Sequence, residues 1–181
     1  MIPLRFTAAE AATAYDQWGA NCGPGAIAAI CGLSLNDLRP HLGTFERKRY
    51  TNPTLMWQVL KALGVMWTLQ TNGTQAWPVY GLARVQWEGP WTRPGAPRRA
   101  RYRHTHWVAA QRRPGRPDDV GIFDINCMNA GGWVGLKDWA EVVVPWILKE
   151  CEPQADGRWH LTHVVEVDPL SALKVQRRLA A

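Results

Sequence analysis

The run of small and apolar residues CGPGAIAAIC, residues 22–31, restricts the fold more than any other part of the sequence. Asn21 is a favourable N-terminal cap, Pro24 is tolerated in a first helical turn, and Gly32 is a typical helix end. A helix that is apolar all round has to be covered on every side. The sequence therefore predicts a short buried helix over residues 22–31, beginning at Cys22.

Two more helices are predicted directly after this one, and strands follow them. Ser34 can cap a short helix within residues 34–42. Residues 51–64 predict a third helix with one apolar face and a glycine at its end: Leu55, Val59, Leu60, Leu63 and Gly64. Apolar, strand-like runs separated by turn residues then predict strands at residues 65–70, 79–87, 101–113, 120–126 and 158–168, with turns at residues 71–74 and 114–119.

The last third of the chain completes the prediction. Residues 135–150 indicate a helix that Pro145 should kink or divide, and residues 169–181 a short basic helix. The Pro/Arg-rich residues 90–101 are predicted to form a mobile loop. Because helices come first and strands follow, the 181 residues are expected to form a single α+β domain with segregated layers. A hydrophobic content of 46% is ordinary for such a domain.

Composition excludes several classes of protein. No stretch approaches the roughly 20 apolar residues of a membrane-spanning helix, so no membrane partner is expected. The N-terminus lacks the pattern of a signal peptide, which predicts a cytoplasmic location. The cysteines are widely spread and form no CxxC pair, which argues against a disulfide scaffold or a zinc ribbon and favours reduced thiols: Cys22, Cys31, Cys127 and Cys151.

Cys22 has the setting that most suggests chemistry. A helix N-terminus stabilises a thiolate through its partial positive charge and free N–H groups, and the same groups can face an oxyanion. Gly23 and Gly25 are expected to keep side chains away from a substrate at this point. The alternative is that Cys22 is only a small buried hydrophobe in a tight helix start.

A reactive cysteine also needs a base and a group that orients the base. His106 stands at the head of an apolar strand, and the next predicted strand carries Asp124 and Asn126. These two share one strand face because side chains alternate, and either could bond the far imidazole nitrogen. His104, two residues before His106 and on the same predicted face, is the alternative base.

In this order the motifs resemble the papain-like cysteine peptidases, and within that superfamily most closely the bacteriocin-processing (double-glycine leader) peptidases and their relatives. CGP opens the first helix, LSLNDLRPHLG and TLMWQVLKALGV correspond to the next two helices, HW begins an apolar strand, and an aspartate ends the following one. The resemblance covers about residues 15–126, whereas residues 127–181 match nothing in it.

The resemblance implies a papain-like fold, with a helical half carrying Cys22 and an antiparallel sheet half carrying His106 and Asp124. It implies Cys22 as nucleophile, His106 as general base and acid, and Asp124 as the orienting residue. It also implies a glutamine that donates to the oxyanion. Gln17 is the match, although it lies five residues before the cysteine rather than six, and Asp16 occupies the family spacing.

Several residues near these motifs are further candidates. Asn126 and His104 are possible supporting residues, and the candidates for substrate binding are Gly23, Trp18, Trp107, Arg101 and Arg103. Cys22 together with His104 and His106 also fits part of a zinc site. No further Cys or His is placed to complete it, so neither a metal nor another cofactor is expected. His160 and His163, three positions apart on a predicted strand, are expected to face opposite sides.

A basic segment flanks the strand of His106. Between Arg93 and Arg116 the chain has eight arginines and no acidic residue: Arg93, Arg98, Arg99, Arg101, Arg103, Arg112, Arg113 and Arg116. Such a run is usually a solvated surface. The alternative is an electropositive rim that attracts an acidic partner or nucleic acid, in keeping with the net charge of +6.

Together these features predict a cysteine-nucleophile hydrolase that cleaves a peptide, protein or other amide substrate through a thioester. Acyl transfer and deamidation use the same residues, and the order of residues does not separate them. The alternative from another class is a non-catalytic binding module, whose Arg-rich hairpin binds nucleic acid or an acidic protein.

Overall fold

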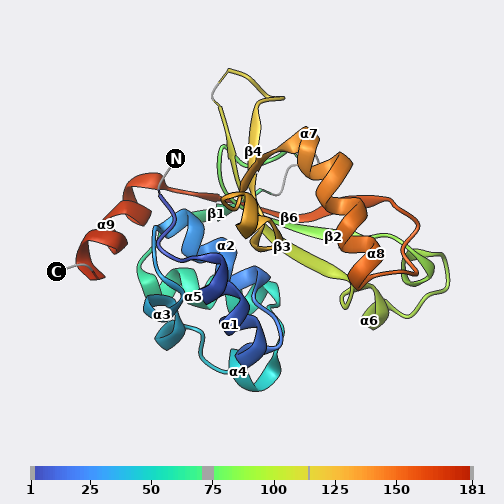
Figure 1. The fold of residues 1–181 in the computed structure, drawn as a ribbon, viewed down its shortest axis with the longest axis horizontal. Coiled ribbons are helices and arrows are strands. Elements are labelled where there is room, and N and C mark those ends of the chain that lie inside the picture. The colour runs from blue at the N-terminus through green and yellow to red at the C-terminus, as the bar shows by residue number, and fades with distance from the viewer. Residues whose placement is uncertain (1–2, 71–75, 114, 180–181) are drawn as a thin grey trace.

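The computed structural model describes residues 3–70, 76–113 and 115–179. These residues form an α+β structure in which a group of helices precedes and packs on an antiparallel sheet (Figure 1). The predicted α+β class is confirmed.

The helical half is built around α2. Its elements are α1 (Ala8–Trp18), α2 (Cys22–Cys31), α3 (Leu35–Leu38), the 3-10 turn η1 (Arg39–His41), α4 (Phe45–Lys48) and α5 (Pro53–Leu63). The helices predicted at residues 22–31, 34–42 and 51–64 are confirmed, the first with its predicted bounds. Every residue of α2 after Cys22 is buried, as expected for a helix without a polar face.

α1 is a helix that the sequence analysis did not identify. It begins with a capping box, in which Thr7 N donates to Glu10 Oε2 at 2.7 Å and Glu10 N donates to Thr7 Oγ1 at 3.2 Å. Gly19 ends it in the left-handed conformation, with φ of 70°. The T-x-x-E spacing before an alanine-rich run was the signal available in the sequence.

The described residues form a six-stranded antiparallel sheet. Its strands are β1 (Trp67–Leu69), β2 (Tyr80–Trp87), β3 (Thr105–Arg112), β4 (Val120–Phe123), β5 (Trp133–Gly135) and β6 (Trp159–Val167), in the spatial order β1-β6-β2-β3-β4-β5. The five predicted strands and the β3–β4 hairpin are confirmed, with shorter bounds, whereas β5 was not predicted. The turn predicted at residues 71–74 lies outside the described residues, as does residue 114 of the turn predicted at 114–119.

The sheet separates two apolar cores. Leu82 and Trp107 point into the core formed with the helical half and α9 (Pro169–Leu179). Their neighbours Ala83 and Val108 point into the opposite core, formed with α8 (Val144–Cys151). Figure 1 shows α1–α5 gathered on one side, with α8 separated from them by the sheet. Side chains that start on the same strand therefore reach either core.

β4 is shorter than predicted, which changes the setting of Asp124. The strand ends at Phe123, and Asp124 caps the 3-10 helix η3 (Ile125–Ala130) by accepting a hydrogen bond from the Asn126 backbone N–H at 3.0 Å. Aspartate favours such turns because its short side chain can bond the backbone two residues ahead. The prediction that Asp124 and Asn126 share a strand face is therefore wrong.

An irregularity in the pairing of β2 with β6 reorients a histidine. The register shifts so that Arg84 lies opposite His163 and Gln86 lies opposite His160. Since Arg84 and Gln86 share a face of β2, both histidines lie on that face too. The prediction that they face opposite sides is wrong. A bulge adds one residue to β6 between the two histidines, so that side chains three positions apart lie on the same face.

The helix predicted at residues 135–150 is divided, as Pro145 suggested. α7 (Leu136–Asp138) leads into a π-helical turn (Trp139–Val143), and α8 follows with Pro145 in its first turn, where a missing N–H is tolerated. Trp139, at the start of the π-helical turn, is fully buried against the sheet. The terminal helix predicted from residue 169 is present as α9.

The segment predicted as a mobile loop contains regular structure, namely the 3-10 turn η2 (Pro90–Thr92) and α6 (Arg98–Arg101). Trp91 is buried there, and its Nε1 donates to the carbonyl oxygen of Trp87 at 2.7 Å. As for membranes, no helix among the described residues combines the length and the apolar character needed to cross one.

Candidate active site

Cys22 lies where α2 meets an open edge of β3. β4 pairs with β3 only from Ala109 onward, so the start of β3 has no partner strand on this side among the described residues. Trp87 N–H donates to the carbonyl oxygen of His104 on the opposite side, and backbone directions alternate along a strand. The N–H of Trp107 therefore faces the open edge, where it helps to lower the pKa of the Cys22 thiol.

His106 is the second residue of β3, and its ring lies on the face that packs on α8. The imidazole stacks on Trp87, with ring centroids 6.0 Å apart and planes at 21°, and the residue is 7% exposed. Its Nε2 lies 2.9 Å from Asp124 Oδ2. Its ring also acts on Cys22, because its hydrogen bonding and positive charge lower the pKa of that thiol.

Asp124 is completely buried, and both of its carboxylate oxygens are saturated with donors. Oδ2 accepts from the Trp139 Nε1 at 2.8 Å as well as from His106. Oδ1 accepts from the backbone N–H and the Nδ2 of Asn126, each at 3.0 Å. A buried carboxylate with this many donors is stable in its charged form and has a fixed orientation.

The charges of these groups favour a thiolate. Burial by itself raises the pKa of Cys22, but the hydrogen bond and positive charge of His106, with the Trp107 N–H, outweigh burial and lower it below the usual range. The negative charge of Asp124 opposes this lowering to a smaller extent. By contrast, burial raises the pKa of Cys31 and of Cys127 to about 12.

The histidine and the aspartate stabilise each other's charged forms. Burial disfavours an imidazolium, yet the charge and hydrogen bond of Asp124, and then the contact with Cys22, hold the pKa of His106 well above its usual range. Burial likewise favours a neutral Asp124, but His106, Trp139 and the Asn126 N–H together lower its pKa. The three pKa shifts thus all favour the charged forms, namely the thiolate, the imidazolium and the carboxylate.

Cys22 is half-buried and opens onto a cleft of about 730 Å³ between the helical half and the sheet. Residues 49–53 form one wall, and Arg84, Tyr102, Arg103, Thr105 and His163 form the other. Asn21, next to Cys22, lines a second pocket of about 350 Å³ together with Asn126. An extended substrate can therefore lie on both sides of the sulfur.

The two glycines beside Cys22 have a different role from the one expected. A Cβ at Gly23 would overlap the side chain of Thr51, and one at Gly25 would overlap Ile125. The missing side chains thus make room for a cleft wall and for the helix that follows Asp124. Gly23 and Gly25 are needed for packing, and neither residue lines the cleft.

Two tryptophans expected to bind substrate are core residues instead. Trp18 is 2% exposed and packs edge-on against Phe45. Trp107 is 1% exposed, and its indole Nε1 donates to the Thr51 carbonyl oxygen at 3.2 Å. The prediction of substrate contact is wrong for both. An indole ring has a large apolar surface, and in the core this surface is removed from water more completely than in the wall of an open cleft.

Gln17 and Cys22 are not brought together. Gln17 lies on the exposed face of α1, where its Oε1 accepts from Arg39 Nη1 at 3.5 Å, and it lines a separate surface pocket. Asp16, which has the family spacing, lines the pocket of Asn21. This geometry does not support Gln17 as an oxyanion donor. The closest candidates are the N–H groups of Cys22 and Gly23, which have no acceptor within α2.

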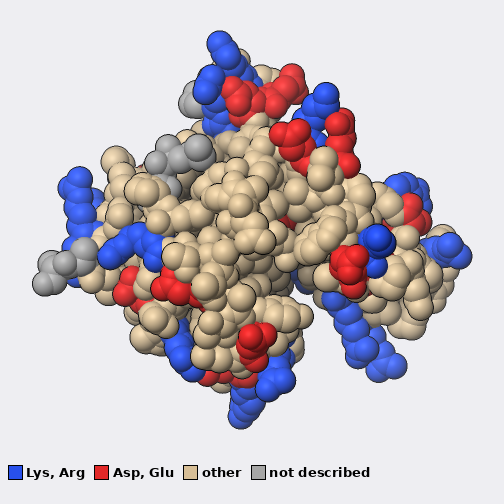
Figure 2. Space-filling view, viewed as in Figure 1, with Lys and Arg blue, Asp and Glu red and all other residues tan. Residues whose placement is uncertain are grey.

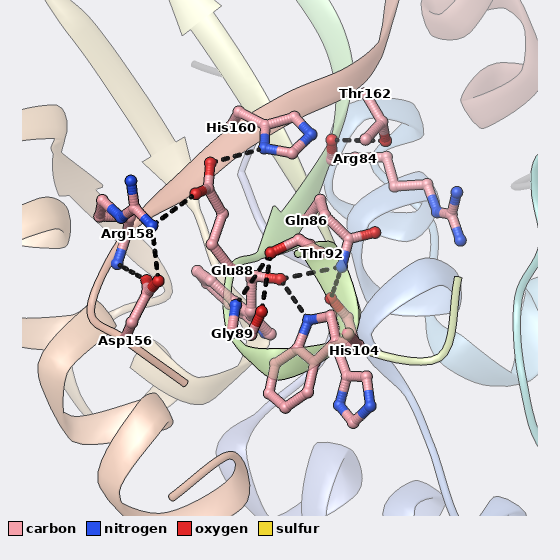
Figure 3. Close-up of polar contacts among 12 residues, drawn as sticks. Arg84, Gln86, Glu88, Gly89, Thr92, His104, Asp156, Arg158, His160 and Thr162 are labelled. Carbon is pink, nitrogen blue, oxygen red and sulfur yellow. Dashed lines mark hydrogen bonds and ion pairs between the residues drawn. The ribbon is translucent and has the colours of Figure 1, made fainter. Parts of the chain in front are cut away.

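His104 is held away from Cys22 by other partners. Its ring stacks on Trp91 at 3.5 Å between centroids, and its Nδ1 lies 2.7 Å from Glu152 Oε2. Figure 3 shows its carbonyl oxygen bonded to Gln86. His104 precedes β3, which begins at Thr105. The structure therefore places His106, and not His104, in contact with the cysteine, while Asn126 supports Asp124 as described above.

The arginine-rich segment does not form one continuous rim. α6 and its flanks carry the arginines from Arg93 to Arg103, whereas Arg112, Arg113 and Arg116 lie at the far end of β3, about 25 Å away for eight residues of strand. Arg113 pairs with Asp119 at 3.1 Å. On the face in Figure 2, Lys and Arg form separate groups at the periphery. Arg103 lines the cleft, and Arg101 does not.

Sequence reasoning missed three residues of the site. Trp139 and Trp87 enclose the histidine and the aspartate, and Arg84 lines the cleft from β2 with only 3% of its surface exposed. The signal for Arg84 was an arginine in the middle of a mostly apolar strand. Trp139 had no local signal, because the π-helical turn that directs it inward depends on the whole sheet.

Within the described ranges, no three His, Cys, Asp or Glu side chains are grouped as metal ligands. His104 pairs with Glu152 and does not converge with Cys22 and His106, so the zinc alternative finds no geometric support. Comparison of the chain with protein-family models, with curated proteins and with solved structures gave no match.

Proposed function

We propose that the protein is a cysteine-nucleophile hydrolase of the papain-like type, which cleaves a peptide or other amide bond through a thioester. The observation that carries the proposal is the contact of Cys22 with His106 at an open cleft, with the pKa of the thiol lowered and that of the imidazole raised. The resemblance of the motif order to papain-like peptidases supports it independently.

The first half of the reaction forms the thioester. The Cys22 thiolate attacks the carbonyl carbon, and the oxyanion that develops faces the N–H groups at the start of α2. When the C–N bond breaks, the imidazolium of His106 gives its proton to the leaving nitrogen, so that an amine departs and a neutral imidazole remains.

The second half restores the enzyme. The neutral imidazole takes a proton from water, and the resulting hydroxide attacks the thioester carbonyl. The C–S bond then breaks, which releases a carboxylic acid and regenerates the thiolate beside the imidazolium. Asp124 keeps the ring in place throughout, and Trp87 and Trp139 exclude water from the Asp124–His106 hydrogen bond.

The thioester can be trapped directly. The protein is mixed with 4-nitrophenyl acetate, the released nitrophenolate is followed by absorbance, and the acylated residue is located by mass spectrometry. We expect a burst of about one nitrophenolate per protein, with the acetyl group on Cys22. Cys22→Ala should abolish the burst, and the matched variant Cys151→Ala should keep it.

A mixture of denatured proteins then tests amide cleavage, with new chain ends identified by mass spectrometry. New ends that appear with the wild type and not with Cys22→Ala support hydrolysis. An unchanged burst in Cys22→Ala, or acylation elsewhere, contradicts the proposal. When a primary amine is added, amide products in place of acids identify an acyltransferase that uses the same residues.

A further inference from the structure

Arg84 is a buried cation that the fold satisfies only in part, with its guanidinium carbon 5.7 Å from the centroid of the Tyr102 ring. It lies on the central strand β2, 3% exposed, on the face directed at the helical half. Its Nη2 donates to the Thr105 Oγ1 at 3.0 Å and to the Tyr102 carbonyl oxygen at 3.3 Å. Among the described residues, its Nε and Nη1 have no hydrogen-bond partner. Three N–H donors of the guanidinium are therefore unused.

An arrangement of this kind is unfavourable in the absence of a ligand. A buried cation is normally paired with an anion, and each unpaired buried donor destabilises the folded state. In the described structure Arg84 forms no ion pair, although Glu88 directly follows the end of β2. In Figure 3 the guanidinium extends away from the network of Glu88, His160 and Arg158.

The cleft around Arg84 is also positive. The residues that line it include three arginines and one histidine, and none is acidic: Arg49, Arg84, Arg103 and His163. Burial lowers the pKa of Arg84, and the charges of Tyr102 and Cys22 oppose this, so Arg84 lies within electrostatic range of the reacting sulfur. The pKa of His163 is lowered as well, first by the burial of His163 and then by the positive charge of Arg84.

We propose that this cleft contains a subsite for a carboxylate of the substrate, next to the bond that is cleaved, and that Arg84 binds this carboxylate. The proposal rests on the proposed function of Cys22, because that function places the scissile bond at the sulfur. Arginine matches a carboxylate in shape and charge, and peptides carry carboxylates on acidic side chains and at their C-terminus. The unused donors of Arg84 are then the specificity determinant of the cleft.

The reactivity of Cys22 toward two alkylating agents tests the subsite. Iodoacetate and iodoacetamide form the same C–S bond and release iodide, but only iodoacetate carries a carboxylate. We expect the ratio of the iodoacetate to the iodoacetamide rate at Cys22 to exceed that of glutathione by at least tenfold. Arg84→Gln should lower the ratio to within threefold of glutathione, while Arg84→Lys, which keeps the charge, should retain part of the preference.

Arg101→Gln is the matched control, because it removes an arginine from α6 that does not line the cleft, and its ratio should stay within twofold of the wild type. Circular dichroism shows which variants are folded, and if Arg84→Gln is not, Arg84→Lys and Arg84→Met take its place. A ratio in a folded, charge-removing variant that equals that of the wild type overturns the subsite. Failure of Cys22 to react with either reagent contradicts the proposed function instead.

Direct binding separates the subsite from catalysis and identifies the source of the carboxylate. The Cys22→Ala variant is titrated with N-acetylisoglutamine, which has only a side-chain carboxylate, and with N-acetylglutamine, which has only an α-carboxylate. The neutral control is N-acetylglutamine amide, and binding is followed by NMR. We expect one of the two acids to bind at least tenfold more tightly than the control, and Arg84→Gln to abolish the difference.

Tighter binding of N-acetylisoglutamine identifies an acidic side chain, and tighter binding of N-acetylglutamine identifies a chain terminus. Inorganic phosphate is titrated in parallel. If phosphate binds at Arg84 and neither acid does, or if all three glutamine derivatives bind equally, the carboxylate subsite is overturned.

Discussion

At the scale of single residues, the site depends on how Asp124 is held. Four hydrogen bonds fix its carboxylate, and one of them comes from His106. The aspartate acts on Cys22 in two opposite ways: its own charge disfavours the thiolate, whereas it keeps His106 protonated, which favours the thiolate. The contributions of His106 to the pKa of Cys22 are the larger ones.

The variant Asp124→Asn should therefore raise the pKa of Cys22. Without the carboxylate, the pKa of His106 falls, and the sulfur loses its hydrogen-bonded cation. We expect alkylation of Cys22 by iodoacetamide to become at least about tenfold slower at pH 6, which corresponds to a pKa shift of about one unit, and to recover by pH 9. An alkylation rate with the wild-type pH profile would show that Asp124 does not influence the charges of Cys22 and His106.

Trp139→Phe tests the hydrogen bond from the indole to Asp124. Phenylalanine keeps most of the buried ring but removes the donor, which leaves one bond of a buried carboxylate unmade. We expect the free energy of unfolding in urea to fall by about 1–3 kcal/mol. Trp146→Phe, on the exposed side of α8, is the control and should change it by less than about 0.5 kcal/mol. Equal effects of the two variants would refute this role of Trp139.

How far single residues could be predicted depended on how local their signals were. Cys22, His106 and Asp124 could be named as candidates because a helix cap, the head of an apolar strand and the end of its partner are read from neighbouring residues. In the structure His106 contacts Asp124 and acts on the pKa of Cys22. Gln17 was misplaced because α1 was not recognised, and the helix turns this side chain toward Arg39. Trp139 and Arg84 depend on contacts between distant segments.

At the scale of elements, the early end of β4 creates the place where Cys22 docks. Since β4 stops at Phe123, the start of β3 has a free edge, and α2 brings its first residue to that edge. The strands were predicted from alternation and turn residues, but their ends were not. The alternation of apolar and polar residues does not show where a strand ends because an aspartate caps a helix. It also does not show where a bulge shifts the register of β6 against β2.

Gly81→Ala should disrupt the centre of the sheet. A Cβ at Gly81 would overlap the carbonyl oxygen of Val165, a backbone atom that cannot move without breaking the pairing of β2 and β6. We expect a loss of about 3 kcal/mol or more in the free energy of unfolding. Gly121→Ala, also in a strand, has no atom closer than 3.8 Å and should change stability by less than about 0.5 kcal/mol. Similar unfolding curves for the two variants would show that the close approach at Gly81 is absent.

At the scale of the whole molecule, the site joins the two halves of the fold. Cys22 comes from the helical half, His106 and Asp124 come from the sheet, and a separate apolar core supports each face of that sheet. The α+β class was predictable because helical and strand-like periodicities are segregated along the chain. The division of the apolar residues into two cores was less predictable, because it depends on which strand residues face α8.

The stability of the whole molecule should reflect the ionisation of Asp124. Because its folded-state pKa is lowered, its charged form stabilises the fold above the unfolded pKa of about 3.9, and this contribution is lost as the pH falls through the lower folded-state value. We expect the difference in unfolding free energy between the wild type and Asp124→Asn to be larger at pH 5 than at pH 2. The other carboxylates titrate in both proteins, so their contributions cancel in the difference between the two unfolding free energies. A difference that does not change with pH would contradict a buried, charged Asp124.

The most direct test of a reactive thiolate at Cys22 is alkylation of the four cysteines by iodoacetamide at pH 6, with each site quantified by peptide mass spectrometry. We expect Cys22 to react at least about tenfold faster than the more exposed Cys151, because the pKa of Cys22 is lowered whereas that of Cys151 is raised, and we expect His106→Ala to remove the advantage. Alkylation of Cys22 no faster than Cys151, or a fast reaction that persists without His106, would contradict it.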